Sequence, residues 1–154
     1  MAARVYPILN TALRRRAVIF DDERGIRTAL WLFFDKRDYE VFTFPYPDLC
    51  PLHVASKCPC PVGTVCSDII ISDVNMGGTN GLDFVAKLMD KGCRQRHFAL
   101  VSGAFTNADR ERASHLGCAV FEKPFEMEAL TTWVEAVEKS IPTDRVLFNW
   151  AGMA

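Results

Sequence analysis

The sequence lacks any long hydrophobic run, and it has almost no excess of charge of either sign. Its longest apolar run, Ala29–Phe34, is far shorter than the ~20 residues that a transmembrane helix needs. The net charge of −1 gives no general attraction to nucleic acid or to an anionic membrane surface. The basic cluster Arg14–Arg16 follows the mildly apolar start, which is the reverse of the order in a secretory signal. We therefore expect a cytoplasmic protein that binds neither nucleic acid nor membranes.

The chain does contain short apolar runs that alternate with helical patterns, and its 154 residues fit one domain. The expected strands are residues 16–21, 39–44, 68–73, 97–102 and 118–121, and the expected helices are residues 23–37, 82–91, 106–117 and 125–140. This alternation predicts an α/β protein with a parallel sheet covered by helices on both faces. Residues 1–15 are expected to form an N-terminal extension, and 142–154 a tail that is too apolar for a solvated linker.

Polar side chains stand at the carboxyl ends of four of the predicted strands. They are Asp21 and Asp22 after the first strand, Asp73 after the third, Ser102 after the fourth and Lys123 after the fifth. In parallel sheets ligands bind beyond these strand ends. Each residue alone is also typical of a helix cap or a turn. Four such features at four strand ends, in this order, indicate a functional site.

The three carboxylates predict a metal ion, because each close pair costs about 4 kcal/mol at ~4 Å and an effective dielectric near 20. Mg²⁺, or Mn²⁺ in its place, suits oxygen ligands. We assign Asp22 and Asp73 as direct ligands, Asp21 as a ligand through water, and the main-chain carbonyl of Asn75 as the remaining protein ligand.

A metal ion, the Lys123 ammonium and the Ser102 hydroxyl together would stabilise the charge of a transferring phosphoryl group. Asp73 is then the nucleophile, since aspartyl phosphates are an established type of covalent intermediate. The sequence therefore predicts that Asp73 accepts a phosphoryl group.

Five segments resemble the receiver domain of two-component response regulators, over roughly Arg16–Ile141. They are IFDDE (Ile19–Glu23), IIISDVNM (Ile69–Met76), NGLDF (Asn80–Phe84), LVSGA (Leu100–Ala104) and FEKPF (Phe121–Phe125). The resemblance implies a flavodoxin-like (CheY-like), doubly wound five-stranded parallel sheet of order 2-1-3-4-5. It also implies Mg²⁺-dependent transfer from a sensor histidine kinase or histidine phosphotransfer protein to Asp73, slow self-hydrolysis, and a cis Lys123–Pro124 bond.

Residues 16–141 are thus expected to form the receiver domain, with no room for an output domain after Ile141. We expect a stand-alone receiver that signals through a conformational switch to an unidentified downstream protein, or passes its phosphate onward. Two departures from the family pattern stand out: Gly77 replaces the usual proline, and Val120 replaces the usual switch aromatic. Valine cannot make the inward swing of an aromatic ring, which puts the usual readout in doubt.

Residues 45–67 break the pattern with five prolines and four cysteines, and they are expected to form an irregular insert in place of much of the second helix. Cys50, Cys58, Cys60 and Cys66 are either free thiols, a zinc or iron–sulfur site, or partners in a disulfide. Elsewhere, Cys93 is expected to be a surface turn thiol and Cys118 a small core residue.

Two alternative functions remain open on the sequence. A metal or redox sensor would use the insert Cys50–Cys66 as its detector on a receiver scaffold. A phosphatase or phosphotransferase would use Asp73 as its nucleophile and would need a second carboxylate at position 75, where the chain has asparagine.

Overall fold

The computed structural model describes residues 14–150, and its core is a five-stranded parallel sheet. The strands lie in the order β2-β1-β4-β7-β8, which is 2-1-3-4-5 when the strands of this sheet alone are counted. Their bounds are β1 Arg16–Phe20, β2 Glu40–Phe44, β4 Ile69–Asp73, β7 Phe98–Ser102 and β8 Ala119–Glu122. The predicted flavodoxin-like order is confirmed.

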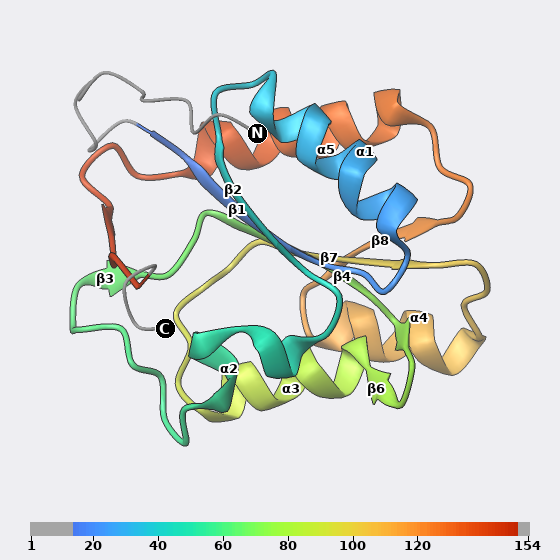
Figure 1. Ribbon diagram of the computed structural model, residues 1–154, viewed down its shortest axis with the longest axis horizontal. Helices are drawn as coiled ribbons and strands as arrows, with labels where there is room; N and C mark the ends of the chain where they lie inside the picture. The colour runs from blue at the N-terminus through green and yellow to red at the C-terminus, as the bar shows by residue number, and fades with distance from the viewer. Residues whose placement is uncertain (1–13, 151–154) are drawn as a thin grey trace.

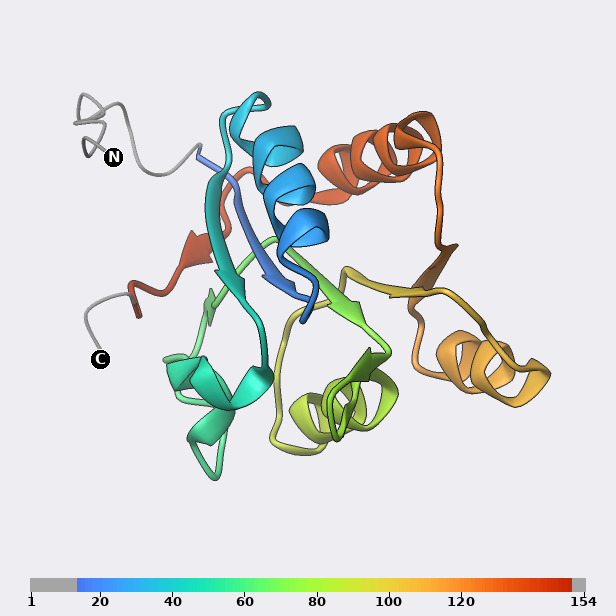
Figure 2. The same ribbon diagram turned by 45° about the vertical axis from the view of Figure 1, so that its right-hand side comes forward.

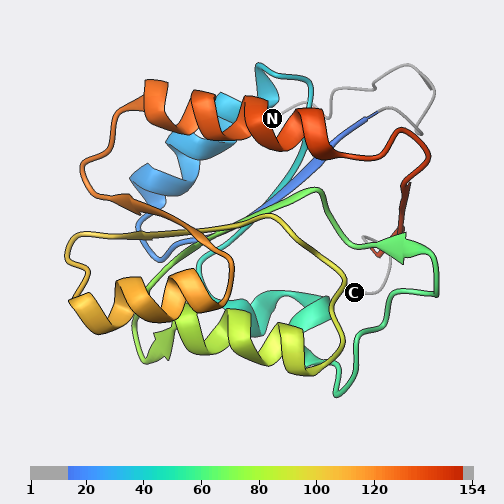
Figure 3. The same cartoon turned by 180° about the vertical axis from the view of Figure 1, so that it is seen from behind.

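Helices cover both faces of the sheet (Figures 1 and 3). One face carries α1 and α5, and the other carries α2, α3 and α4. The helices are α1 Arg24–Asp35, α2 Pro51–Val54, α3 Gly81–Asp90, α4 Asn107–His115 and α5 Met127–Ser140. The four longer helices confirm the prediction from the periodicity of the sequence. Each begins and ends within two residues of its expected bounds.

The sheet divides the core into two clusters, because successive side chains of a strand point to opposite faces. On β1, Ile19 packs toward α1 and α5, whereas Val18 and Phe20 pack on the other side. All five residues of β1, β4 and β7 are buried. Strands buried on both faces require continuous apolar runs, which is the pattern that the sequence shows.

Local hydrogen bonds fix where two helices begin. The Thr106 side chain accepts from the Asp109 N–H and the Asp109 carboxylate accepts from the Thr106 N–H, so the expected capping box begins α4. Asn80 caps α3, and its side-chain oxygen accepts from the N–H groups of Leu82 and Asp83. The α3 cap matters for function because it follows Asp73 by only a short hairpin.

That hairpin consists of β5, Asn75–Met76, and β6, Thr79–Asn80, which pair in antiparallel orientation. Gly77 and Gly78 join the two strands with φ angles of 50° and 100°. Proline fixes φ near −65° and cannot adopt these values. The missing family proline at position 77 is therefore a consequence of the turn that this chain makes.

Residues 45–67 contain little regular structure, as expected. The segment holds a 3₁₀ turn, η1 Pro47–Leu49, the four-residue helix α2, and a two-residue strand, β3 Thr64–Val65. Hydrogen bonds tie the segment to the end of α3: Lys91 Nζ donates to the carbonyl of His53 at 2.6 Å, and the Cys58 N–H donates to the carbonyl of Lys91 at 3.0 Å. A full second helix is therefore replaced by a compact irregular insert.

The described part of the tail, residues 142–150, packs onto this insert (Figure 2). Strand β9, Val146–Leu147, pairs in parallel with β3. Arg145 Nε and Nη2 donate to the two carboxylate oxygens of Asp68 at 2.6 and 2.7 Å, and both side chains are almost fully buried. Trp150 is 2% exposed and lies against the ring of Phe42, with centroids 4.6 Å apart. The expectation that the tail is not a solvated linker is met in this part, while residues 1–13 and 151–154 lie outside the described residues.

Within residues 14–150, none of the helices has both the length and the apolar character needed to cross a membrane.

Candidate functional site

The predicted site residues meet at one end of the sheet. Asp73 is the last residue of β4, Asp21 directly follows β1, and Lys123 directly follows β8. Parallel pairing brings these ends together, since Phe20 lies beside Ser72 and Val101 lies beside both Asp73 and Phe121. An open cleft at this end is lined by polar groups and by parts of α1 and the β8–α5 loop: Asp22, Glu23, Ile26, Ala29, Leu30, Asp73, Asn75, Gly103, Lys123, Pro124, Phe125 and Met127.

The Lys123 ammonium lies among three carboxylates. Its Nζ is 3.0 Å from Asp21 Oδ2, 3.1 Å from Glu23 Oε1 and 3.6 Å from Asp73 Oδ2. The Lys123 N–H donates to the carbonyl of Ser102 at 2.8 Å, and the Lys123–Pro124 peptide bond is cis, as the family resemblance implied. The ammonium therefore points at the predicted acceptor, Asp73.

The electrostatics of the site show the cost of gathering these groups. Burial raises the pKa of Asp73 to about 6, and the charge of Asp21 adds to this shift, while Lys123 and the N–H of Asn75 oppose it. Burial also raises the pKa of Asp21, against a hydrogen bond from the N–H of Glu23 at 2.8 Å. For Lys123, burial lowers the pKa, but contacts with Asp21 and Glu23 and the charge of Asp73 outweigh it and raise the pKa overall. The cleft thus holds more negative charge than one ammonium offsets.

This cleft fits a hard divalent cation. Within the part of the chain that the structure describes, the carboxylates of Asp21, Glu23 and Asp73 have ligand oxygens within 4.8 Å of one another. Asp21 Oδ2 is buried, and the Lys123 ammonium, 3.0 Å from it, is shared with Glu23 and Asp73. A cation would both satisfy this oxygen and offset the repulsion that raises the carboxylate pKa values.

Glu23 is the acidic residue that the sequence interpretation missed. It is the third acid of the run Asp21–Glu23, and that run was the available signal. The exposed side chain of Asp22 lies in the wall of the same cleft, and its charge raises the pKa of Asp73, but it is outside the group of oxygens within 4.8 Å. Its role as a direct metal ligand stays a prediction, as does the water-mediated role of Asp21.

Removing the Asp73 charge is expected to stabilise the metal-free protein at basic pH. The folded-state pKa of about 6 exceeds the ordinary value of 3.8, so folding favours the protonated acid and stability falls as pH rises through about 4 to 6. Above this window the penalty is complete and amounts to roughly 2–3 kcal/mol. Asp73→Asn should therefore raise the melting temperature by about 5–10 °C near pH 8, and by much less near pH 4.

Thermal melts with excess chelator measure this effect. Added Mg²⁺, in excess over the chelator, should then raise the melting temperature of the wild type, because the ion binds only the folded cleft. It should not raise that of Asp73→Asn, which lacks the Asp73 carboxylate as a ligand. An Asp73→Asn variant that melts at or below the wild-type temperature near pH 8 would contradict the prediction.

Ser102 and Asn75 adjoin the acceptor. The buried Ser102 Oγ donates to the carbonyl of Ala104 at 3.1 Å and accepts from its N–H at 3.2 Å. The Asn75 side chain donates to Ser102 Oγ at 3.5 Å, and its N–H donates to Asp73 Oδ1 at 3.4 Å. These contacts connect the β4 and β7 ends, while the phosphoryl contact of Ser102 and the carbonyl ligand from Asn75 stay predictions.

Val120 lies in the middle of β8, beside Leu100 of β7. It is half-buried and packs against the core cluster on the α3 and α4 side. A compact side chain in this place has no polar tip to move between solvent and the interior.

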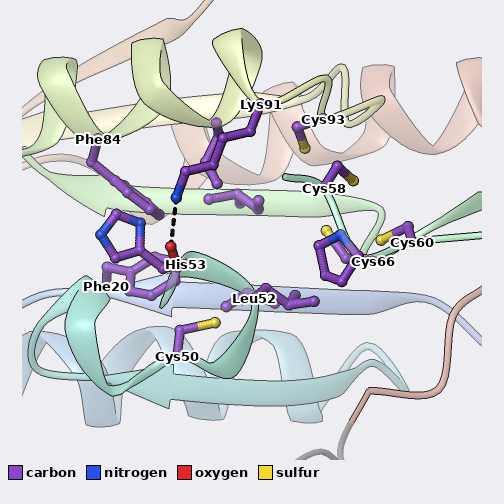
Figure 4. A pocket seen from close by; sticks show the side chains of 14 residues that line it. Phe20, Cys50, Leu52, His53, Cys58, Cys60, Cys66, Phe84, Lys91 and Cys93 are labelled. Carbon is purple, nitrogen blue, oxygen red and sulfur yellow. Dashed lines mark hydrogen bonds between the residues drawn. The ribbon is translucent and has the colours of Figure 1, made fainter. Parts of the chain in front are cut away.

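The six cysteines are all free thiols. Cys50, Cys58, Cys60 and Cys66 all line one internal pocket, but they do not share one wall of it (Figure 4). Cys93 lines the same pocket. Cys93 follows the turn after α3 but is half-buried and packs against the core, so the expectation of a surface turn thiol is met only in part. Cys118 is half-buried against the core, close to the expectation.

Comparisons with known proteins agree with this geometry. The family model described as "Response regulator receiver domain" matches residues 17–135. Similar solved structures include chemotaxis protein CheY4 of Vibrio cholerae, with 23% identity, a TM-score of 0.63 and coverage of 80% of this chain and 98% of that one. The non-phosphorylated HemR receiver domain of Leptospira biflexa has 20% identity, a TM-score of 0.65 and coverage of 80% and 94%.

A response regulator receiver protein from Pseudomonas putida has 21% identity, a TM-score of 0.65 and coverage of 80% and 97%. A comparison with curated proteins finds no match. At these identities the solved structures establish the fold, and the family match, which spans most of the chain, establishes the family. This protein belongs to the response regulator receiver domain family.

Proposed function

We propose that the protein accepts a phosphoryl group on Asp73 from a sensor histidine kinase or a histidine phosphotransfer protein, and that Mg²⁺ is required. The observation that carries this proposal is the position of the Lys123 ammonium, 3.6 Å from Asp73 Oδ2 and 3.0 Å from Asp21 Oδ2. The cytoplasm, where such donors present their phosphohistidines, is the proposed location. Mn²⁺ would serve in place of Mg²⁺ because it accepts the same oxygen ligands.

The chemistry is an in-line displacement at phosphorus. An Asp73 carboxylate oxygen forms the new O–P bond while the N–P bond of the phosphohistidine breaks, and the imidazole leaves with its electron pair. Asp73 attacks as the carboxylate, which its pKa of about 6 provides at neutral pH even without a metal ion. The backbone N–H of Asn75, 3.4 Å from Asp73 Oδ1, helps to hold the carboxylate in place.

Lys123 and Ser102 act on the transferred group. The ammonium, which pairs with Asp73 and Asp21 at rest, is within reach of an equatorial phosphoryl oxygen once the carboxylate has become an acyl phosphate. The Ser102 hydroxyl would exchange its bond to Ala104 for one to a second phosphoryl oxygen. Bound Mg²⁺ would neutralise the negative charge that accumulates on the phosphoryl oxygens. Asp73 and the Asn75 carbonyl would hold the ion, together with one or more of Asp21, Asp22 and Glu23.

Rearrangement of Ser102 and its loop would pass the signal to a protein partner. Ser102 is joined to Ala104 by two hydrogen bonds and to Asn75 by a third, so a change in its hydroxyl moves the β7–α4 loop. Val120 cannot follow with the aromatic swing seen in many receivers. The proposed switch therefore acts through the β7–α4 loop itself.

Acetyl phosphate tests the acceptor directly. With Mg²⁺ present, intact mass spectrometry should show the gain of one phosphoryl group on the wild-type chain. Asp73→Asn should show none, because the amide is not a nucleophile. The matched control is Asp83→Asn, an exposed aspartate on α3 that pairs with Arg112 and should leave the gain unchanged.

Two outcomes would overturn the proposal. One is a wild-type protein that gains no phosphate from acetyl phosphate or from any phosphohistidine donor. The other is a gain that persists in Asp73→Asn, since the phosphate would then be on another residue.

A further inference from the structure

Four cysteines from two separate segments lie around one end of the internal pocket (Figure 4). Cys58, Cys60 and Cys66 belong to the insert, and Cys93 belongs to the loop between α3 and β7. The pocket is a cavity of about 30 Å³ with almost no polar lining besides these thiols, His53 and Lys91. Four thiols in an apolar cavity have no role in the phosphoryl-acceptor site, which is at the other end of α3.

The insert and the loop meet at this end of the pocket, where Cys66 lines the wall together with Cys60 and Cys93 (Figure 4). The backbone N–H of Cys58 donates to the carbonyl of Lys91 at 3.0 Å, which holds Cys58 against the loop that carries Cys93. Cys50 is apart from this group, beside Leu52 and His53 (Figure 4).

Arg94 shapes the loop that carries Cys60. Its Nη2 donates to the carbonyls of Cys60, Pro61 and Thr64 at 2.9, 2.6 and 3.1 Å. Thr64 closes the turn by donating its N–H to the Pro61 carbonyl at 3.0 Å. A tight turn after Cys60, tied to the residue next to Cys93, keeps the two thiols on the same side of the cavity.

We propose that these four cysteines form a structural zinc site that joins the insert to the α3–β7 loop. The ligands are Cys58, Cys60, Cys66 and Cys93. This set differs from the one that the sequence spacing suggested, because Cys93 takes the place of Cys50. The proposal is independent of the chemistry at Asp73.

The thiols line a cavity with almost no polar surface, so they need a cation if they are to ionise. Soft thiolates are the preferred ligands of zinc, and a coordinated thiol loses its proton. Binding of one Zn²⁺ releases four protons to solvent and leaves a tetrathiolate with a net charge of −2. Lys91 lines the cavity and the charge of Arg94 acts on Cys93, so both offset that charge.

Zinc binding requires a rearrangement of these side chains. Across the residues that the structure describes, the acidic cleft is the group whose ligand atoms all lie within 4.8 Å, and the four sulfurs are more widely spaced. A tetrahedral site with Zn–S bonds of ~2.3 Å brings sulfurs to within ~3.8 Å of one another. The irregular segment 55–63 allows this closure, because no helix or strand constrains Cys58 or Cys60.

Metal content of the full chain, purified without chelators, tests the site. Elemental analysis should give close to one zinc per chain for the wild type. Cys93→Ser should lose most of this zinc, whereas the matched control Cys50→Ser should keep it. Cobalt substituted for zinc should give the intense visible absorption of tetrahedral thiolate coordination in the wild type and in Cys50→Ser.

Circular dichroism of each variant shows whether it folds. If Cys93→Ser does not fold, the zinc content of the wild type still decides whether the site exists. Zinc far below one per chain, both as purified and after titration of the reduced protein with Zn²⁺ against a chromophoric chelator, would overturn the proposal. Retention of zinc in folded Cys93→Ser with its loss in Cys50→Ser would overturn the ligand set. A disulfide between Cys66 and Cys60 or Cys93 in metal-free protein treated with peroxide, with no zinc uptake beforehand, would point to a redox pair instead.

Discussion

Trp150→Ala is expected to lower the free energy of unfolding by about 3–5 kcal/mol, a large part of the stability of a small domain. The indole is 2% exposed and fills the space between β2 and the insert, with ring centroids 4.6 Å from Phe42 and 6.3 Å from Phe44. Its Nε1 also donates to the Cys66 carbonyl at 2.9 Å. The substitution would leave a cavity and would remove one of two hydrogen bonds that the Cys66 carbonyl accepts, the other coming from Arg16 Nη1 at 3.0 Å.

Urea denaturation of the wild type and the variant measures this difference. Trp150→Phe should recover much of the loss, because it keeps the ring but not the hydrogen bond. The matched control is Trp31→Ala on α1, where the indole is 37% exposed and the cost should stay near 1 kcal/mol. Equal losses for the two alanine variants would show that the tail is not part of the core.

Gly81→Ala is expected to abolish phosphorylation at Asp73 and to cost roughly 3 kcal/mol of stability or more. A Cβ at Gly81 would clash with the carbonyl oxygen of Asp73 and would lie 3.0 Å from Asp73 C and from Ser72 Oγ. The neighbouring atoms are backbone in the centre of the sheet, which cannot shift without moving the acceptor carboxylate. Overpacking of this kind usually costs 1–3 kcal/mol, and backbone neighbours place this case at the upper end.

The acetyl phosphate assay and a denaturation curve together measure both effects. Gly25→Ala is the matched control, since it also stands in the first turn of a helix but has nothing within 4 Å of its added Cβ. It should keep full phosphorylation and be neutral or slightly stabilising. Wild-type phosphorylation in a folded Gly81→Ala variant would show that the close approach of α3 to β4 has no role at the site.

Much of the fold follows from local features that the sequence displays directly. The strand Ile69–Asp73 begins with an apolar run, and α4 begins at a capping box that Thr106 and Asp109 form. The small strands were not predictable, because β3 and β9 each have two residues and pair only across the 80 residues between them. A two-residue strand has no period, so nothing in the local sequence distinguishes it from a loop.

The site could be predicted in outline for a similar reason. Asp21, Asp73 and Lys123 stand at the ends of apolar runs. Parallel strands bring their carboxyl ends to the same edge of the sheet, whatever the details of side-chain packing. Glu23 was missed because its contact with Lys123 depends on how the first turn of α1 is oriented. The partial burial of Cys93 was missed because its position under the insert depends on the path of a loop with no regular structure.

By itself, then, the sequence determined the alternation of strands and helices, the order of the polar residues at the strand ends, and the family to which they point. Only the tertiary structure decided that Glu23 shares Lys123 with Asp21, that Cys93 joins the thiols of the insert, and that Trp150 completes the core. Periodicity and caps are set by neighbours within a few residues along the chain. Contacts between irregular segments are set by side-chain packing between residues far apart in the sequence. Local sequence patterns therefore do not predict them.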